Sequence, residues 1–375
     1  MLSTLAHGSP APAIRAGRLE IAIAPATDVA GAGYADVFGE SRATAFQHPL
    51  WLSHFYGTLA PAREATPVLV AGMLDGRPSF YLPMIRRRMW GTTLLEAADL
   101  GVCDYCAPVI RESDRGTLGE TGDLAARVAQ ASGHHDILRI RNIREDHCPD
   151  WRLFFSAPAR RLDFSSHETG LGSDHEIWSG RAYTESFAKY LKRRKNRFFR
   201  QPGARLVTIG NAAEACEAIG RLAELRQGRF EGDMIAIPAV RRFYAEIAEA
   251  GVENGFASVY RLEVGSETIG LVFGVNHGGR FLYLLIGCDY EKHGRHSPGL
   301  LIYDGIIEQQ GRSGGHVFDF TIGDEPFKAD FGTRAIPIHA MEAARTVQGR
   351  LALLLQPLHQ QARRRLAAAM QGGHA

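Results

Sequence analysis

The chain has 375 residues, of which 45% are hydrophobic and 22% charged. This composition is typical of a globular protein, and the length exceeds what one hydrophobic core usually supports, so we expect two domains. The 43 basic and 41 acidic residues give a net charge of +2, which excludes a strong overall field. DNA is therefore not an expected partner, and any anion must be bound by a local patch.

Cysteine usage and hydropathy indicate a cytoplasmic protein. Five cysteines in so long a chain argue against a disulfide framework and fit a reducing compartment. Cys103 and Cys106 have metal or redox spacing, but no second pair follows at a zinc-like distance, so we expect a structural role and no metal. No early apolar stretch resembles a signal peptide, and no apolar run reaches the ~18 residues of a membrane span.

After a loose leader at residues 1–17, the first half reads as a strand, a helix and a hairpin, followed by a further helix and strand. The predicted ranges, in that order, are 18–24, 27–38, 67–73 with 78–84, 124–132 and 137–140. Residues 156–180 are rich in Ser, Gly and His and favour a connector, and residues 183–200 favour a basic bridging helix. The same order of elements then returns, so the first half resembles a degenerate copy of the second.

The second half is more regular. A strand, two helices, a three-stranded meander, a helix and a last strand are predicted at residues 205–209, 212–226, 238–252, 257–263, 268–275, 281–288, 299–310 and 317–321. Ser297 suits the N-cap of the 299–310 helix and Pro298 its first turn. The unpaired amides at this helix start could hold a phosphate.

A motif of about forty residues in this region resembles a known family. Its members are Tyr290, Ser297, Pro298, Gly299, Leu300, Leu301, Ile306, Gly311, Phe318, Asp319, Phe320, Gly323, Phe327, Lys328 and Phe331. The motif is similar to that of GNAT-like acyltransferases of the CelD-like group, associated with cellulose or exopolysaccharide biosynthesis and related to Fem-type aminoacyl transferases. Weaker echoes lie at 46–51, 82–83, 104–105 and 191–197, so the resemblance covers roughly residues 18 to 345.

The resemblance implies an α/β (α+β) protein of two tandem GNAT-like (acyl-CoA N-acyltransferase) domains, with mixed, mostly antiparallel sheets flanked by helices. The expected ranges are 18–160 for a degenerate N-terminal domain, 161–200 for a connector and basic helix, 201–345 for the acyltransferase domain and 346–375 for a C-terminal helix. That last helix is amphipathic and basic, and it could dock on its own domain or touch a membrane or a membrane-bound synthase partner.

Direct acyl transfer needs a polarising donor, a proton acceptor and a cradle for the acyl carrier. The catalytic candidates are Asp319, Lys328, His296 and Tyr290. Asp319 should lie on a buried strand, where an acid is either a satisfied structural group or a site residue. The resemblance implies that the carrier binds at Ser297, Gly299, Leu300 and Phe320. The pyrophosphate turn matches the usual GNAT pattern only in part, so acyl carrier protein or aminoacyl-tRNA stay open beside acyl-CoA.

The acceptor should bind between the domains, where ligand sites often form. Candidate contacts are Trp51, Asp104 and Tyr105, although Trp51 alone is more often a core residue. Arg193 belongs to a dense basic run on the bridging helix, which is either a solvated face or a binding site for a phosphate-bearing substrate or tRNA. The predicted function is transfer from acyl-CoA to an amine or hydroxyl of a sugar or polysaccharide precursor. The alternatives are a Fem-type aminoacyl-tRNA-dependent transferase and a non-catalytic accessory protein of a polysaccharide synthase.

Overall fold

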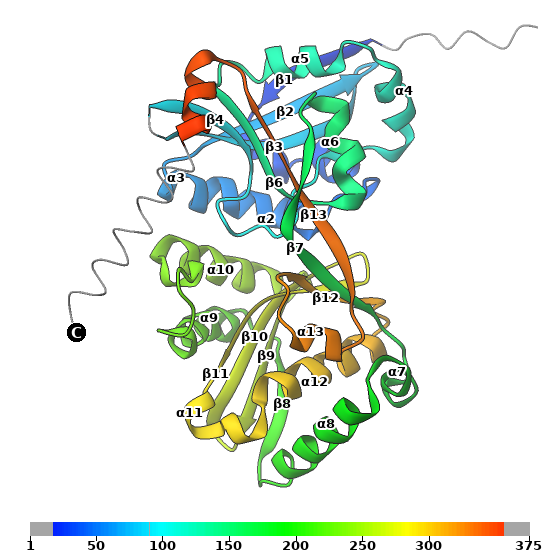
Figure 1. Cartoon of the computed structure of the whole chain (residues 1–375), viewed down its shortest axis with the longest axis vertical. Coiled ribbons are helices and arrows are strands. Elements are labelled where there is room, and N and C mark those ends of the chain that lie inside the picture. Colours follow the sequence, from blue (N-terminus) through cyan, green and yellow to red (C-terminus); the bar gives the residue numbers. More distant parts are fainter. Residues whose placement is uncertain (1–17, 90, 356–375) are drawn as a thin grey trace, which may run out of the picture.

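The computed structural model describes residues 18–89 and 91–355, which form two α/β halves joined by one continuous mixed sheet (Figure 1). The strands lie in the order β1-β2-β3-β4-β6-β13-β7-β12-β11-β10-β9-β8, with β5 beside β3. Neighbouring strands are antiparallel except for two parallel pairs, β4 with β6 and β11 with β12. Each parallel pair lies near the middle of its own half.

The N-terminal half, called the N-half below, contains six strands and six α-helices within the described residues. The strands are β1 (Leu19–Ala24), β2 (Thr66–Leu74), β3 (Arg77–Met89), β4 (Thr92–Ala97), β5 (Val109–Ile110) and β6 (Ile137–Arg144). The helices are α1 (Ala32–Gly39), α2 (Pro49–His54), α3 (Ala60–Ala62), α4 (Arg115–Glu120), α5 (Leu124–Ala131) and α6 (Cys148–Phe154). The predicted helix at 27–38 begins instead as a 3-10 turn at Ala26–Ala30, before α1.

The C-terminal half, the C-half, follows the predicted order closely. Its strands are β8 (Ala204–Ile209), β9 (Ala257–Val264), β10 (Glu267–His277), β11 (Arg280–Cys288) and β12 (Val317–Ile322). Its helices are α7 (His175–Ala182), α8 (Glu185–Phe198), α9 (Ala212–Arg226), α10 (Pro238–Gly251), α11 (Tyr290–His293), α12 (Pro298–Arg312) and α13 (Phe327–Asp330). The short turns of the β9-β10-β11 meander hold these strands in antiparallel register.

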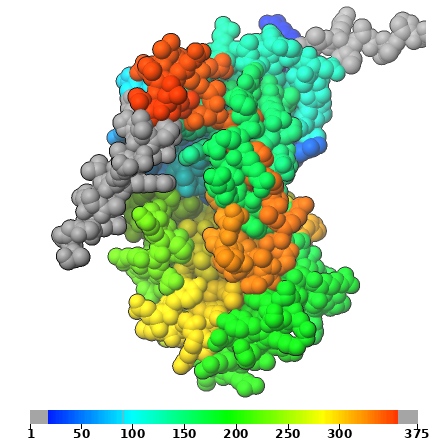
Figure 2. Space-filling view, in the orientation of Figure 1, coloured from blue at the N-terminus to red at the C-terminus, as the bar shows by residue number. Residues whose placement is uncertain are grey.

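Two long strands tie the halves together. Strand β7 (Ala159–Gly170) pairs with β12 through residues 166–170 and with β13 (Arg334–Ala344) along most of its length. Strand β13 also pairs with β6, so the last described strand completes the sheet of the N-half. Green and orange atoms of these segments cover the waist of the molecule in Figure 2. The connector expected at 156–180 is therefore a strand over 159–170. Its polar composition hid this strand, which pairs with β13 over residues 159–168 and with β12 over residues 166–170.

Each half contains a wedge in which two parallel strands separate. Strands β11 and β12 pair only from Arg280 with Val317 to Leu282 with Asp319. Strands β4 and β6 likewise pair only from Leu94 with Ile137 to Glu96 with Arg139. Beyond these three pairs the strands diverge. We call the two openings the C-wedge and the N-wedge.

The hydrophobic core crosses the boundary between the halves. Trp51 on α2 is fully buried, with its ring 4.9 Å from Phe243 on α10 and 5.1 Å from Phe46. A second cluster fills the space between the C-half sheet and helices α8 and α12. Because aromatic packing joins the halves at α2 and α10, we expect them to fold and unfold together.

The two chain ends lie largely outside the described residues. The leader predicted at 1–17 lies outside them, as does the part of the predicted C-terminal helix beyond residue 355. Residues 347–355 are helical, as expected. Within the described ranges, no helix is both long and apolar enough to cross a bilayer.

Candidate active site

The C-wedge is lined by aromatic side chains from both of its strands. Phe320 on β12 is fully buried, and Tyr283 on β11 lies with its ring 6.5 Å from that of Phe320. Tyr303 on α12 and Phe327 stack with ring centroids 5.4 Å apart and an interplanar angle of 4°. These rings belong to the second core cluster and form an apolar layer behind the separated strands, which suits an acyl chain or the thin arm of a carrier.

A bulge in β12 shapes the apex of the C-wedge. The register of β12 shifts between Asp319 and Ile322, and Thr321 between them has a φ of 56°. A positive φ is unusual for a β-branched residue and occurs where the surroundings enforce it. Thr321 is held by its hydroxyl, which donates to the Tyr283 carbonyl across the wedge at 2.9 Å.

Helix α12 starts at the open end of the C-wedge, as predicted. Ser297 is its N-cap but has a left-handed φ of 55°, and its side chain makes no capping bond. Its hydroxyl instead pairs with the Tyr190 hydroxyl of α8 at 2.7 Å. The first-turn amides of this 15-residue helix therefore have no side-chain cap, and they form a potential anion site.

Gly299 and Leu300 lie in the first turn of α12, where space is limited. A Cβ atom on Gly299 would meet the Tyr290 hydroxyl at 2.7 Å and Ile286 at 3.5 Å. Leu300 is partly buried and packs against the second core cluster. Gly299 thus lets the Tyr290 side chain lie directly over the helix start.

Tyr290 is half-exposed beside this helix start, and the Arg229 guanidinium lies 4.2 Å from its ring centroid. Partial burial raises the pKa of its phenol, and Cys288 adds to the shift. The hydroxyl therefore stays protonated at neutral pH and can donate a hydrogen bond. Its position over α12 favours a contact with the carrier rather than with the reacting carbonyl.

His296 is buried, in contrast to the solvated position usual for a loop histidine. It is 2% exposed, its ring lies edge-on to Phe198 at 5.6 Å, and its Nε2 accepts from Arg295 at 3.1 Å. Burial lowers its pKa, with Arg295 as the next cause. A neutral His296 therefore stabilises the turn before α12 by packing it against Phe198 of α8.

Helix α8 brings a cationic face beside the start of α12. The Arg194 guanidinium donates to the Arg295 carbonyl and lies 4.8 Å from the Tyr190 ring. A shallow depression of about 520 Å³ on this helix is lined by Lys189, Lys192, Arg193, Asn196, Arg197 and Arg200. Arg193 thus belongs to α8, which contacts the turn before α12 through Tyr190 and Arg194. Figure 1 shows α8 at the end of the C-half away from α2, the helix that carries Trp51. A phosphate-bearing carrier fits this placement better than an acceptor does.

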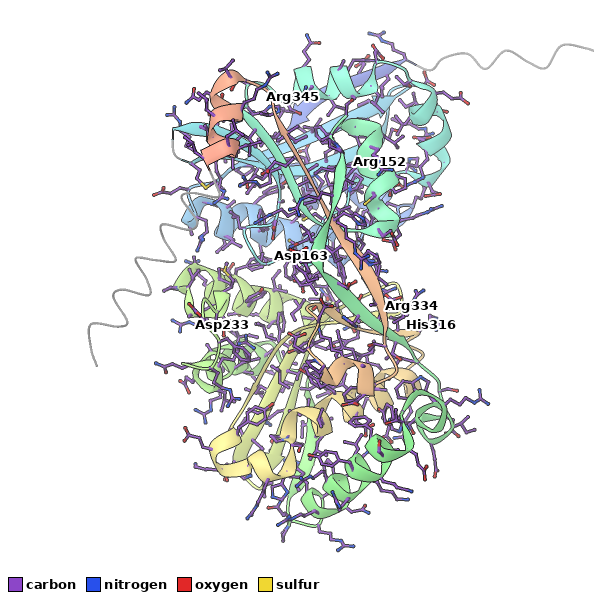
Figure 3. All side chains as sticks on the ribbon, viewed as in Figure 1. Arg152, Asp163, Asp233, His316, Arg334 and Arg345 are labelled. Atoms are coloured by element: carbon purple, nitrogen blue, oxygen red, sulfur yellow. The ribbon has the colours of Figure 1, made fainter. Side chains whose placement is uncertain are left out.

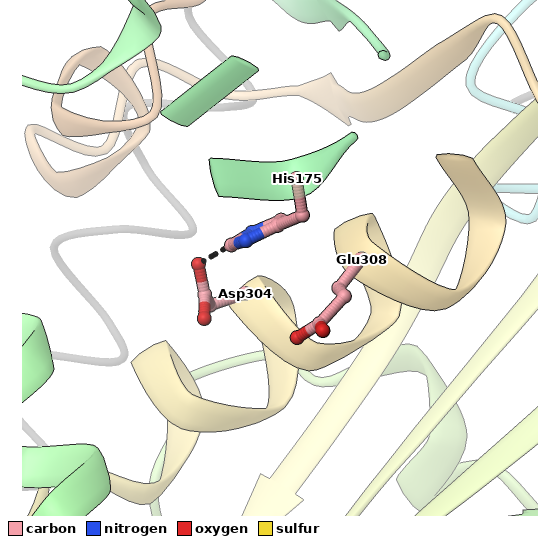
Figure 4. Close-up of side chains that lie close together, drawn as sticks. All are labelled: His175, Asp304 and Glu308. Carbon is pink, nitrogen blue, oxygen red and sulfur yellow. Dashed lines mark ion pairs between the residues drawn. The ribbon is translucent and has the colours of Figure 1, made fainter. Parts of the chain in front are cut away.

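Lys195 of the same helix is not part of that cationic face. It pairs with Asp304 at 2.5 Å and with Glu308 at 3.6 Å on α12. His175 also lies 3.0 Å from Asp304 (Figure 4), and Tyr183 donates to Asp304 at 2.7 Å. His175, Asp304 and Glu308 are close enough together to hold a metal ion, but both carboxylates already have cationic partners, Lys195 on Asp304 and Arg312 on Glu308. We interpret this cluster as a clasp that holds α7 and α8 on α12.

Asp319 lies at the centre of a buried ionic network. One carboxylate oxygen accepts from the Tyr105 hydroxyl at 2.7 Å and the Thr321 amide at 2.8 Å. The other accepts from Arg280 at 3.0 Å, with Arg144 at 3.5 Å. Burial raises the pKa of Asp319, while Arg280 and Arg144 oppose the shift. With four donors around it, Asp319 has a positioning role in this geometry, and its predicted catalytic role stays a prediction.

Glu168 completes this network from β7. It accepts from Arg144 at 3.1 Å and from Arg334 at 3.0 Å, and it also pairs with Arg280. Arg334 extends from β13 in Figure 3. Although burial acts in the opposite direction, Arg280 and Arg144 lower the pKa of Glu168 to about 2. The network therefore joins strands from both halves at the apex of the C-wedge.

Lys328 is buried, and its ammonium faces backbone carbonyls. Its Nζ donates to Ile322 at 3.0 Å and to Gly323 at 2.8 Å, and it pairs with Glu325 at 2.8 Å. These contacts use its three protons to close the loop after β12. Lys328 lies on α13, just after strand β12 of the C-wedge. Its predicted catalytic role stays a prediction.

Asp104 has the properties of a proton acceptor. It lies half-buried on the segment after β4, which extends over the C-half. Burial raises the pKa of its carboxyl to about 7, the nearby Asp99 and Asp319 add to the shift, and a hydrogen bond with Thr321 opposes it. Its neighbour Tyr105 is fully buried and holds Asp319. Asp104 and Tyr105 thus adjoin the wedge apex, whereas Trp51 is enclosed in the core.

A cavity of about 430 Å³ opens between the halves next to this apex. Its lining residues include Arg42, Thr44, Tyr105, Arg144, His277 and Arg280. A second cavity of about 560 Å³, near the loop between α9 and α10, is lined by Arg226 and Asp233 among others. Arg226 donates to the Ile286 carbonyl of β11 at 2.7 Å, which places this second cavity against the C-wedge strand.

Comparisons with known proteins agree with this geometry. Residues 185–329 match the acetyltransferase (GNAT) domain family. This segment runs from the start of α8 into α13 and therefore contains the C-wedge and the start of α12. No curated protein matches the sequence. The transferase type of the C-half thus rests on a sequence match as well as on its geometry.

Solved structures show the same architecture over most of the chain. FemX is 11% identical, with a TM-score of 0.60 over 90% of this chain and 99% of FemX. A tandem GNAT protein from the clavulanic acid biosynthesis pathway is 14% identical, with a TM-score of 0.51 over 87% of this chain and 98% of that protein. The C-terminal domain of a putative lysylphosphatidylglycerol synthetase from Agrobacterium fabrum is 12% identical, with a TM-score of 0.52 over 88% and 96%. The predicted tandem GNAT-like fold is confirmed.

Four members of the ionic network, Glu168, Arg144, Arg280 and Arg334, were missed in the sequence. Glu168 lies in the segment interpreted as a connector, and Arg144 and Arg280 lie at strand ends. No local motif marks them, because their partners come from strands far apart in the chain. The one available signal was Asp319 itself, since a buried acid requires a cationic partner.

Proposed function

We propose that this protein transfers an acyl group from acyl-CoA to an amine or hydroxyl at the C-wedge. The observation that carries the proposal is the separation of β11 and β12, backed by an apolar layer, together with the uncapped start of α12 at its open end. The separated strands suit the acyl arm, and the helix start with the adjacent cationic face of α8 suits the phosphates of the carrier. Acyl carrier protein would use the same features through its phosphopantetheine arm.

Asp104 is the proposed general base. Its pKa of about 7 matches the operating pH of a proton acceptor. The nucleophile attacks the thioester carbonyl and gives its proton to the Asp104 carboxylate, the C–S bond breaks, and the CoA thiolate leaves and takes up a proton. Tyr105 and Asp319 hold the Asp104 segment over the wedge through their hydrogen bond.

The acceptor is proposed to enter through the 430 Å³ cavity between the halves. Its lining offers hydroxyl, guanidinium and imidazole groups, which suit a polar substrate with many hydroxyls. Together with the resemblance to the CelD-like group, this lining supports a sugar or polysaccharide precursor as the acceptor class.

The test measures release of free CoA from acetyl-CoA with glucosamine as an amine probe and glucose as a hydroxyl probe. We expect Asp104→Asn to lower kcat by about 10²–10⁴ and to remove the rise of the rate with pH near 7, because the base must be deprotonated. Asp163→Asn is the matched control, since Asp163 is an exposed acid on β7 (Figure 3). An unchanged rate and pH profile in a folded Asp104→Asn protein would exclude this base.

A second candidate is aminoacyl transfer from tRNA. The specific observation that favours it is the cationic depression on α8, in which five of the six lining residues are Lys or Arg. FemX and the putative lysylphosphatidylglycerol synthetase share the fold, which alone does not assign the donor. Salt-sensitive binding of aminoacyl-tRNA, with no CoA release from acetyl-CoA by either probe, would favour this candidate.

A further inference from the structure

The N-wedge contains a cavity that the proposed acyl transfer does not use. Strands β4 and β6 separate after Glu96 and Arg139, and a space of about 270 Å³ lies at this point. It is lined by Arg63, Ile85, Arg87, Glu96, Ala97, Asp99, Leu100, Gly101, Arg139, Arg141 and Met234. The backbone therefore repeats the C-wedge opening, but the lining is charged instead of aromatic.

Arginine dominates this lining. Arg87 and Arg139 both engage Glu96, at 2.7 and 3.8 Å, and Arg139 also pairs with Glu342 at 2.6 Å. Within residues 18–89 and 91–355, Arg63 and Arg141 make no ion pair with a carboxylate. Four guanidinium groups thus face one cavity and are opposed by three carboxylates, Glu96 and Asp99 in the lining and Glu342 on Arg139, which leaves an excess of one positive charge.

The remaining acid does not oppose an anion directly. One oxygen of Asp99 accepts from the amides of Gly101 at 3.0 Å and Cys103 at 3.3 Å, so that oxygen is directed to its own turn. Burial raises the pKa of Asp99 to about 6, and the charge of Arg141 acts in the opposite direction. Ile85, Ala97 and Leu100 supply an apolar floor. The cavity therefore combines paired and unpaired guanidinium groups with a small apolar surface, a combination that suits planar or tetrahedral oxyanions carrying a short carbon chain.

The C-half closes this cavity through Met234. A Cβ atom on Gly101 would lie 2.8 Å from the Met234 terminal carbon, so the two segments are in close contact. The preceding Asp233 forms a two-pronged pair with Arg226 at 2.7 and 3.1 Å. Arg226 in turn bonds the Ile286 carbonyl in the C-wedge. A chain of contacts thus connects the lining of the N-wedge to strand β11 of the C-wedge.

We propose that the N-wedge binds a small organic or inorganic oxyanion, a carboxylate or a phosphate, held by Arg63 and Arg141 with Arg87 and Arg139 behind them. This site lies outside the C-wedge and does not depend on the identity of the acyl donor. Bidentate guanidinium contacts recognise both oxyanion types, so malonate and inorganic phosphate serve as separate probes.

The test titrates the full chain with malonate or inorganic phosphate at constant ionic strength set by chloride, and it follows the melting temperature. We expect a saturable rise with at least one probe, because a ligand of the native state stabilises it by mass action. The double variant Arg63→Gln/Arg141→Gln should need at least tenfold more probe for the same rise. It should fold, since neither side chain has an ion-pair partner in the described residues. A stronger response to malonate than to phosphate would identify a carboxylate site, and the reverse a phosphate site.

Arg88→Gln is the matched control. Arg88 is exposed on β3 next to Arg87, and strand alternation directs its side chain to the opposite face of the sheet. The control removes the same charge and should keep the wild-type response. The proposal is overturned if neither probe gives a saturable rise, or if the double variant and Arg88→Gln respond alike.

Discussion

The two wedges have the same backbone geometry and opposite contents. Each begins with three parallel residue pairs, yet the C-wedge is filled by aromatic rings around Tyr303 and Phe320, and the N-wedge is lined by arginines. The backbone creates an opening in both halves, and the side chains decide what can enter it. The comparison teaches that a duplicated fold does not imply a duplicated site.

The segments that follow the wedge strands differ as well. In the C-half, β11 leads through α11 and a 3-10 turn to α12, whose start faces the wedge. In the N-half, residues 98–108 leave β4 and extend over the C-half, where Tyr105 bonds Asp319. Within the described residues, the segment after β4 therefore does not start a helix at the N-wedge. It contributes Tyr105 to the C-wedge instead. This difference supports a donor site in the C-half and a supporting role for the N-half.

The largest expected effect comes from breaking the network that joins the halves. Glu168→Gln leaves Arg144, Arg280 and Arg334 without their shared carboxylate, and we expect a loss of roughly 3–5 kcal/mol in the free energy of unfolding. Denaturant unfolding measures this loss. Glu120→Gln, an exposed acid on α4, is the control and should change stability by less than about 0.5 kcal/mol.

The same network predicts a pH dependence. The folded pKa of Glu168 is about 2, below the unfolded value of about 4.3. Its stabilising contribution is therefore complete above pH ~4.3 and is lost as the pH falls toward 2. The acid-induced loss of stability between these values should be smaller in Glu168→Gln than in the wild type. An equal loss in both proteins would show that Glu168 is not held ionised by its arginines.

The next effect tests the difference between the two wedges at the start of α12. Gly299→Val places side-chain atoms where the Tyr290 hydroxyl lies, and it fills the first turn of α12. We expect at least about tenfold weaker binding of acetyl-CoA by calorimetry, equivalent to about 1.4 kcal/mol. Gly294→Ala in the 3-10 turn before α12 is the control, because its Cβ would meet only Tyr290 at 3.9 Å. Equal affinity of both variants would remove the α12 start from the donor site.

The smallest effect concerns the cationic face of α8. Changing Lys192, Arg193 and Arg197 together to Gln should raise the KM for the donor about threefold to tenfold with little change in kcat, the pattern of lost uniform binding. The difference should shrink at high salt, because exposed charges are screened within about 10 Å at 0.1 M salt. Lys195 is left unchanged, since it belongs to the clasp with Asp304. A KM that responds to neither salt nor the triple change would make this face a solvated surface.

The strands and helices of the C-half could be predicted from the sequence because the patterns that indicate them lie in consecutive residues. Short turns between apolar runs predicted the β9-β10-β11 meander, and the Ser297-Pro298 pair predicted the start of α12. Strand β7 was not readable, since Ser165, Ser166 and Glu168 are buried polar residues whose partners lie on β12, β13 and β6. Pairing between distant segments leaves no periodic pattern in either one.

The candidate site likewise contains residues that the sequence predicted and residues that only the structure revealed. The residues around Ser297 and Gly299 were found because the chemistry of a helix start is encoded in consecutive residues. The proposed role of Asp104 required coordinates, because its raised pKa depends on burial by the opposite half and on neighbours such as Asp319. For His296, the sequence predicted the position in the turn before α12. It did not predict its burial, which depends on packing against Phe198.

The central claim is that the acyl donor binds in the C-wedge and not in the N-wedge. Hydrogen exchange of the full chain with and without acetyl-CoA tests it most directly, because bound segments open less often. The account predicts protection of residues 283–300, which cover the separated part of β11 and the start of α12, with unchanged exchange in β4 and β6. Protection confined to β4 and β6, with none at residues 283–300, would contradict it.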